Sequence, residues 1–184
     1  MIMTVAAKLF AERGYDGVGI SEVGEATGFG KGALYYHIKS KEDLLFDIMT
    51  IYMMDLIAAA RGIAESDLPA AARLSALSSN FMSIMFASRA EMTVCFREVH
   101  ALSEARQKGV LRLHSEYLEI WDRIFRDGAA SGEFRPMTRL EIKALLGMFF
   151  YSFLWVKTEG SIRVEAIAGM FADLTRRAVR SDRA

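Results

Sequence analysis

The chain has 184 residues, of which 52% are hydrophobic and 25% are charged, and these proportions exclude a disordered protein. Basic and acidic residues balance at 23 each, so any nucleic-acid binding must come from a local basic patch. The single Cys95 excludes an internal disulfide, and the longest apolar run, 144–156, is too short to cross a membrane. We therefore expect a cytoplasmic protein of one or two domains with no membrane association.

Apolar residues at helical spacing, together with only two prolines, predict an all-α fold of about nine helices. The first four helices are expected at residues 2–13, 21–27, 31–37 and 41–61. Gly14 and Gly28 act as C-terminal stops of the first two helices. Ser40 is a natural N-cap for the fourth helix, with Asp43 in its first turn.

The five helices that follow are expected at residues 69–87, 89–102, 106–130, 138–158 and 162–180. Pro69 suits the first turn of the fifth helix, and residues 131–137 are expected to form a turn. Three short helices ahead of six longer ones predict two functional parts, with a boundary near Ser40.

Residues 28–44 read GFGKGALYYHIKSKEDL and crowd glycines, lysines, tyrosines and a histidine together. One interpretation is a phosphate-binding loop. A Walker A motif, however, needs a glycine where Glu25 stands and a serine or threonine where Gly32 stands. The G-x-G-x-x-A spacing also matches a dinucleotide fingerprint, but that motif must follow a strand, and SEVGEAT is predicted to be helical. We therefore reject a phosphate loop.

The other interpretation is a helix-turn-helix that reads DNA. At about 100° per residue, Leu34 and Ile38 face inward together. The side chains that face the opposite way are small, aromatic or basic, namely Gly32, Ala33, Tyr36 and His37, and Lys31 stands at the helix start. Small residues let the backbone approach base edges, while lysine, tyrosine and histidine supply donors to phosphates.

The runs FAERGYDG (10–17) and ISEVGEATGFGKGALYYHIKSKEDLL (20–45) strongly resemble the DNA-binding domain of TetR-type transcriptional regulators, over roughly residues 4–48. The resemblance implies a helix-turn-helix domain at 1–45, whose recognition helix, 31–37, enters the major groove of a double-stranded operator. Position by position, it implies base-reading or groove-lining roles for Lys31, Gly32, Ala33 and Tyr36. It implies phosphate contacts for Tyr35, His37 and Lys41.

The sequence departs from the family pattern at several positions. Ile38 replaces a phenylalanine, and Gly24 stands inside a helix at a cost of up to about 1 kcal/mol. Gly19 and Gly30 replace the usual hydroxyl N-caps, which costs a few tenths of a kcal/mol each, so a loosely held recognition unit is expected. Residues 1–48 carry fewer basic than acidic side chains, and the usual basic arm is missing ahead of the first helix, which leaves open a start upstream of Met1.

The same resemblance implies that residues 46–184 form a ligand-binding and dimerisation domain. The helix at 138–158 is apolar nearly all round, and the helix at 162–180 carries an apolar stripe. A monomer core would explain both patterns, but we favour a homodimer formed through residues 138–180.

Methionine and phenylalanine gather on the fourth to sixth helices, which suits a pliable apolar cavity but equally a plain core. The candidate ligand residues are Met53, Phe81, Met85, Phe96, Arg97, His100, Tyr117, Trp121 and Tyr151. Arg97 and His100, three residues apart on one helix face, are the candidate polar anchors. The runs IWDRIFRDGAASGEFRP and ALLGMFFYSFLW weakly resemble TetR-type repressors of fatty-acid and sterol catabolism, which implies a hydrophobic effector such as an acyl-CoA thioester.

No enzyme motif is present: the sequence lacks a nucleophile elbow, a catalytic carboxylate pair and a redox cysteine motif. His100 and His114 do not match metal-ligand spacing, so we expect neither a metal nor a cofactor. The predicted function is a ligand-responsive dimeric repressor, in which the fourth helix connects the effector site to the DNA-reading segment. The alternative is a helical small-molecule-binding protein or enzyme that has lost DNA binding.

Overall fold

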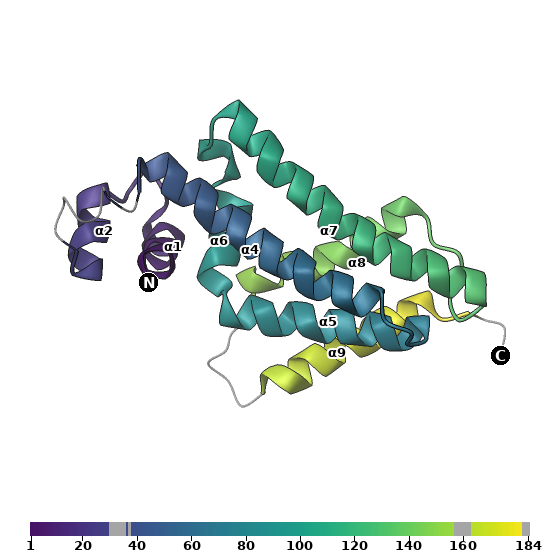
Figure 1. The fold of residues 1–184 in the computed structure, drawn as a ribbon. Helices are drawn as coiled ribbons and strands as arrows, with labels where there is room; N and C mark the ends of the chain where they lie inside the picture. Colours follow the sequence, from purple (N-terminus) through teal and green to yellow (C-terminus); the bar gives the residue numbers. More distant parts are fainter. Residues whose placement is uncertain (30–35, 37, 157–162, 182–184) are drawn as a thin grey trace. The chain divides into compact units, whose positions relative to one another are not determined.

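The computed structural model of the protein describes residues 1–29, 36, 38–156 and 163–181 (Figure 1). These residues form eight α-helices and two short 3-10 helices, which confirms the predicted all-α fold. The α-helices are α1 (Ile2–Arg13), α2 (Ile20–Thr27), α4 (Lys41–Ala64), α5 (Ala70–Ala87), α6 (Arg89–Arg97), α7 (Glu104–Ser131), α8 (Arg139–Phe150) and α9 (Val164–Val179). The 3-10 helices are η1 (Val99–Ala101) and η2 (Ser152–Leu154). Apart from Tyr36, the helix expected at 31–37 lies outside the described residues.

Two of the predicted helices are shorter than expected. The helix expected at 89–102 ends at Arg97, and the chain continues as η1, because the N–H groups of Ala101 and Leu102 donate to carbonyls three residues back. The helix expected at 138–158 ends at Phe150. There the buried Ser152 hydroxyl donates to the Phe149 carbonyl at 2.7 Å, which competes with the helical ladder.

The chain divides into two compact units, each built from two separate segments. Unit 1 is Met1–Asp55 with Ser88–His114, and unit 2 is Leu56–Ala87 with Ser115–Ala184. Helices α4 and α7 therefore supply residues to both units. This division differs from the boundary expected after residue 45, and the functional boundary stays a prediction.

In unit 1, α1 packs against α2 and α6 (Figure 1). Ala6 and Ala7 are fully buried on α1, and their small side chains let neighbouring helices approach closely. Phe10 is 1% exposed and meets the Tyr15 ring edge-on, with 5.3 Å between the ring centroids. Gly14 follows α1 with φ 78°, as expected for a helix stop that needs a positive φ.

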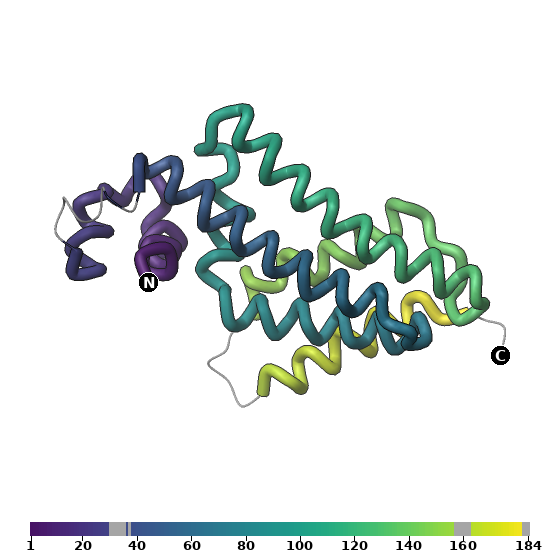
Figure 2. Tube along the Cα trace, in the orientation of Figure 1, coloured from purple at the N-terminus to yellow at the C-terminus, as the bar shows by residue number. Residues whose placement is uncertain are grey.

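In unit 2, α5 and α9 run side by side (Figure 2). Both helices bury apolar faces, which include Leu74 and Leu77 on α5 and Phe171 on α9. Two hydroxyl residues are also fully buried, Ser78 and Thr175, and each donates a 2.8 Å hydrogen bond to the carbonyl four residues earlier. The polar groups in this contact are therefore satisfied within their own helices.

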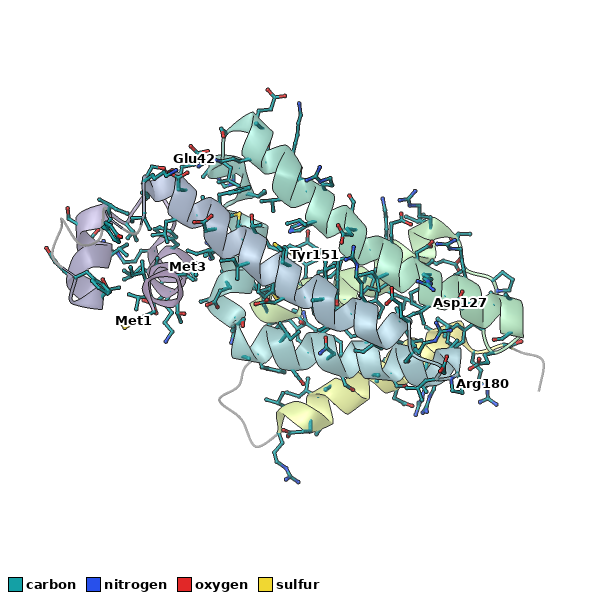
Figure 3. The ribbon with its side chains drawn as sticks, viewed as in Figure 1. Met1, Met3, Glu42, Asp127, Tyr151 and Arg180 are labelled. Atoms are coloured by element: carbon teal, nitrogen blue, oxygen red, sulfur yellow. The ribbon has the colours of Figure 1, made fainter. Side chains whose placement is uncertain are left out.

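A turn at residues 132–136 ties together the ends of several unit 2 helices. The Glu133 carboxylate accepts the N–H groups of Ala70 and Ala71 at 3.1 and 2.9 Å, at the start of α5. Arg135 donates its N–H to the Val179 carbonyl and its Nε to the Ala178 carbonyl, at the end of α9. Figure 3 labels Asp127, near the end of α7, and Arg180, just after α9. Among the described residues, no helix is both long and apolar enough to cross a membrane.

Candidate functional site

Tyr36 and Lys41 are the two predicted DNA contacts that the structure describes. Tyr36 is helical and 88% exposed, whereas Ile38, two residues later, is 7% exposed. This alternation agrees with the expected inward Ile38 and outward Tyr36. The other predicted contacts lie outside the described residues and stay predictions: Lys31, Gly32, Ala33, Tyr35 and His37.

The Lys41 ammonium is held in place by aromatic rings of unit 1. Its Nζ lies 4.0 Å from the centroid of the Tyr15 ring and 5.9 Å from that of Phe10. The negative ring faces attract the cation. Because an ammonium carries three donors, one ring contact leaves N–H groups for a phosphate oxygen. No sequence pattern indicated this arrangement, since Tyr15 and Lys41 are far apart in the chain.

Helix α2 has a different cap from the hydroxyl cap of the family pattern. Gly19 stands at the N-cap, and its N–H donates to Glu22 Oε2 at 2.6 Å. The other carboxylate oxygen of Glu22 accepts from Arg13 at 2.8 Å. These two interactions, first the Gly19 N–H and then Arg13, lower the pKa of Glu22. Glu22 thereby closes the start of α2 and links it to α1.

The first turn of α4 forms the expected cap. Ser40 Oγ accepts the N–H of Asp43 at 3.0 Å and donates to Asp43 Oδ2 at 2.6 Å. Asp43 also binds the Arg106 guanidinium, and the neighbouring Glu42 accepts the N–H of Ser103 at 2.9 Å. In Figure 3, the labelled Glu42 lies at the start of α4, close to the beginning of α7. Sequence patterns identified the cap but not Arg106, because no local spacing connects α4 to α7.

Three of the predicted ligand residues meet in the buried aromatic core of unit 2. The ring centroids of Phe81 and Tyr117 are 6.2 Å apart, and those of Tyr117 and Trp121 are 6.3 Å apart. All three side chains are at most 1% exposed. Met85 is also fully buried in this unit, whereas Tyr151 is 57% exposed.

Two polar groups in this aromatic core lack a well-formed hydrogen bond. The Tyr117 hydroxyl and the Trp121 Nε1 are both buried, and neither has a hydrogen-bond partner of good geometry among the described residues. Burial raises the pKa of Tyr117, and the Trp121 side chain offsets part of that rise. Both groups therefore keep the capacity to bind a ligand atom.

The other predicted ligand residues belong to unit 1. Met53 is 3% exposed there, but the side chains of Arg97 and His100 are exposed. Phe96 stacks on His114 with ring centroids 5.4 Å apart. His114 Nε2 is buried without a hydrogen-bond partner in the described part of the chain, and burial lowers the His114 pKa. The predicted polar anchors thus lie at the surface, and their roles stay predictions.

A surface cleft of about 450 Å³ lies in unit 2, beside the end of α9. Its lining residues are Ala71, Glu133, Phe134, Asp173, Arg176, Arg177 and Arg180, and none of them is a predicted ligand residue. Within the described ranges, no group of three or more His, Cys, Asp or Glu side chains could hold a metal ion.

Family models match both parts of the chain. Residues 67–179 match the tetracyclin repressor-like C-terminal domain, and residues 2–48 match the bacterial regulatory proteins of the tetR family. Together these matches cover α1, α2, the start of α4 and the helices from α5 to α9.

Similar proteins include the HTH-type transcriptional repressor KstR2 of Rhodococcus jostii (strain RHA1). It is 28% identical, over 94% of this chain and 86% of its own length. The crystal structure of the TetR family transcriptional regulator PfmR from Thermus thermophilus is also 28% identical. It covers 96% of this chain and 97% of PfmR, with a TM-score of 0.88.

A third similar structure is AibR in complex with isovaleryl coenzyme A and operator DNA. It is 24% identical, covers 97% of this chain and 96% of AibR, and has a TM-score of 0.79. At this identity the likeness shows a shared fold.

Proposed function

Because the chain belongs to the tetR family of bacterial regulatory proteins, we propose that it is a dimeric repressor released from its operator by a hydrophobic small molecule. Family membership makes it a DNA-binding transcriptional regulator and not an enzyme. The proposal adds repression, the homodimer and the class of effector to that conclusion.

The exposed Tyr36 carries the proposed mode of DNA reading. A tyrosine that is 88% exposed on a helical turn, close to a buried Ile38, presents its ring and hydroxyl outward. Lys41 follows with its ammonium already ordered over Tyr15, so less side-chain entropy is lost when it binds a phosphate. These two side chains support a groove contact and a phosphate contact, respectively.

Exposed apolar side chains on α8, η2 and α9 support a homodimer through residues 138–180. Leu154 and Trp155 are 61% and 60% exposed, and Met170 and Leu174 on α9 are 52% and 47% exposed. Met170 and Leu174 are four residues apart, so they share one face of α9. A second copy of this chain would cover that face, as apolar patches on soluble proteins commonly mark interfaces.

The Tyr117 hydroxyl and the Trp121 indole N–H support an effector that carries an acceptor oxygen within an apolar body. An indole N–H can only donate, and a phenol can donate as well, so one carbonyl oxygen can accept from both groups. The surrounding rings of Phe81 and Phe149 suit a hydrocarbon chain. An acyl-CoA thioester has both features, and isovaleryl coenzyme A is the ligand of the similar protein AibR.

Helix α4 is the proposed connection between effector and operator. Its residues 41–55 belong to unit 1 and its residues 56–64 to unit 2. Two recognition helices of a dimer must lie about 34–36 Å apart to enter successive major grooves. An effector that shifts α4 would change this spacing, and a coupling of about 1–3 kcal/mol would weaken operator binding 5- to 150-fold.

Operator binding is tested with double-stranded DNA that the protein selects from a random library. If a dimer neutralises about six phosphates, the logarithm of the association constant falls with log[salt] at a slope of roughly −5. Affinity that does not respond to salt would contradict binding through the proposed surface.

The effector site is tested by a thermal-shift screen of acyl-CoAs, sterol acids and aromatic acids, followed by operator titrations with each hit. A true effector weakens operator binding, and by linkage the operator weakens effector binding by the same factor. Tyr117→Phe removes only the hydroxyl and should weaken effector binding while leaving operator affinity unchanged without effector. A hit that binds but leaves operator affinity unchanged would contradict release by α4.

A further inference from the structure

We propose that Arg106 is a positioning residue for operator binding, because it fixes the first turn of α4 through ion pairs with Glu42 and Asp43. The inference rests on the proposed function, in which residues just ahead of α4 read the operator. Arg106 lies on α7 and is not a predicted DNA contact, so its effect would pass through the two carboxylates.

Arg106 makes three contacts with the start of α4. Its guanidinium binds the Asp43 carboxylate, and its Nη1 lies 3.6 Å from Glu42 Oε1. Its guanidinium carbon also lies 5.4 Å from the centroid of the Phe46 ring. A planar guanidinium can bind two carboxylates and stack on an aromatic ring at the same time, which a lysine cannot.

The backbone at the start of α7 strengthens this connection. Ser103, directly before α7, donates its N–H to Glu42, and this hydrogen bond is the main reason that the pKa of Glu42 lies below its ordinary value. Gly109, one turn after Arg106, faces Phe46, so that an added Cβ would make an ordinary van der Waals contact with the ring at 3.7 Å. Arg106 on α7 and the backbone of Ser103 just before it therefore both hold the first turn of α4.

Three consecutive residues of α4 thus have partners on two different helices or their flanks. Lys41 lies over Tyr15 after α1, whereas Glu42 and Asp43 bind the start of α7. Successive helical residues point about 100° apart, so the turn is restrained from different directions. Only residues 37–40 separate this turn from Tyr36, the predicted groove contact, so a displacement of the turn would also displace Tyr36.

Charge repulsion and positioning of α4 predict opposite changes in DNA affinity, so an experiment can separate the two explanations. Glu42 and Asp43 are negative charges near the proposed phosphate contact of Lys41. If charge alone mattered, Glu42→Gln with Asp43→Asn would strengthen DNA binding, because two repulsive charges are removed. If these side chains position α4 through Arg106, the same double variant weakens DNA binding.

The test compares Arg106→Ala, the Glu42→Gln/Asp43→Asn double variant and the combined triple variant in operator titrations by fluorescence anisotropy. We expect Arg106→Ala and the double variant each to weaken binding on the order of tenfold, and the triple variant to be no weaker than Arg106→Ala. The slope of log K against log[salt] should equal that of the wild type, because no phosphate contact is lost. Arg112→Ala, which removes an exposed arginine from the same helix, should leave affinity unchanged.

Several outcomes would overturn the proposal. Unchanged affinity of Arg106→Ala would show that the ion pairs do not position α4. A salt slope for Arg106→Ala that is shallower than the wild-type slope by about one would make Arg106 a direct phosphate contact. Tighter binding by the double variant would show that Glu42 and Asp43 affect DNA binding only by charge repulsion. Should Arg106→Ala not fold, as judged by circular dichroism, the double variant decides alone. If the wild type selects no DNA at all, the proposed function fails instead, before any variant is compared.

Discussion

Gly128 on α7 occupies a position where no side chain fits. A Cβ added there would lie 2.0 Å from the Phe134 ring, which is itself 3% exposed. We expect Gly128→Ala to lower the free energy of unfolding by about 1–3 kcal/mol, because the buried ring must move. Thermal or urea denaturation measures this loss.

Gly62 on α4 is the matched control for Gly128. It also lies within a helix of unit 2, but nothing lies within 4 Å of an added Cβ. Gly62→Ala should therefore raise the free energy of unfolding by about 0.4–1 kcal/mol, through the lower entropy of the unfolded chain. If both substitutions changed the free energy of unfolding in the same direction, the close packing of Gly128 against Phe134 would be contradicted.

His114 predicts a pH dependence of stability. Burial lowers the pKa of His114 in the folded protein. In the unfolded chain, the imidazole has the reference histidine pKa of about 6.5. The unfolded chain therefore binds the proton first, and the free energy of unfolding falls as the pH drops from about 6.5 to the lower folded pKa. Above pH 6.5 this group has no effect.

Denaturation measured from pH 5 to pH 8 tests this prediction, with His114→Gln as the variant. The variant should lose this part of the pH dependence, and His100→Gln, at an exposed position of the same unit, should retain it. An unchanged pH profile in His114→Gln would mean that His114 is protonated in the folded protein as readily as in the unfolded chain.

Sequence reasoning identified residues whose partners are close in the chain. Ser40 as N-cap and Gly14 as helix stop follow from local backbone geometry, and the structure confirms both. Arg106 and Tyr15 could not be found in this way, because their contacts with α4 depend on tertiary packing. The buried Tyr117 hydroxyl, which has no hydrogen-bond partner among the described residues, was a candidate by residue type only.

At the scale of helices, Glu133 acts as an N-cap for α5 that comes from outside the helix. Its carboxylate accepts two N–H groups at the start of α5, and these bonds, the one from Ala71 first, lower the Glu133 pKa. Glu133→Ala should lower the free energy of unfolding by about 1 kcal/mol, as for other lost caps. Glu133→Gln keeps an acceptor oxygen and should cost less.

Exposed Glu65 provides the control for this cap. Glu65→Ala removes the same side chain from the same unit, and we expect little change in its unfolding curve. If Glu65→Ala and Glu133→Ala lowered the free energy of unfolding equally, the effect would come from the change in net charge and not from the lost cap.

Helix positions were predicted well, but two helix ends were not. Apolar spacing continues through η1 and η2, so a periodic pattern cannot distinguish a 3-10 turn from the α-helix before it. The end of α8 depends on the buried hydroxyl of Ser152, and burial is a tertiary property. The recognition helix expected at 31–37 lies outside the described residues except for Tyr36.

At the scale of the whole molecule, the proposed dimer predicts the effect of a charge on α9. Leu174→Arg with Met170→Arg places two cations on a face that a second copy would cover. We expect a monomer in analytical ultracentrifugation, together with weaker operator binding, because one subunit reaches only one half-site. Leu68→Arg, at a position that is 51% exposed in unit 2 but outside residues 138–180, should stay dimeric. A dimeric α9 variant would contradict this interface.

The two compact units could not be derived from the sequence. A boundary after residue 45 followed from helix lengths and from the family resemblance, whereas unit 1 also contains α6 and the first part of α7. The packing of α1 against α6 joins segments about eighty residues apart, and such contacts leave no local pattern.

The pairing of α5 with α9 also sets an order of events during protein synthesis. All segments of unit 1 have been made once His114 has left the ribosome, but unit 2 needs α9, which ends at Val179. Until then α5 lacks the helix that it packs against, and a nascent chain of this length is open to chaperones and proteases. Unit 1, which carries the predicted DNA contacts Tyr36 and Lys41, can therefore mature first, while the proposed dimerisation through α9 waits for the last helix to emerge.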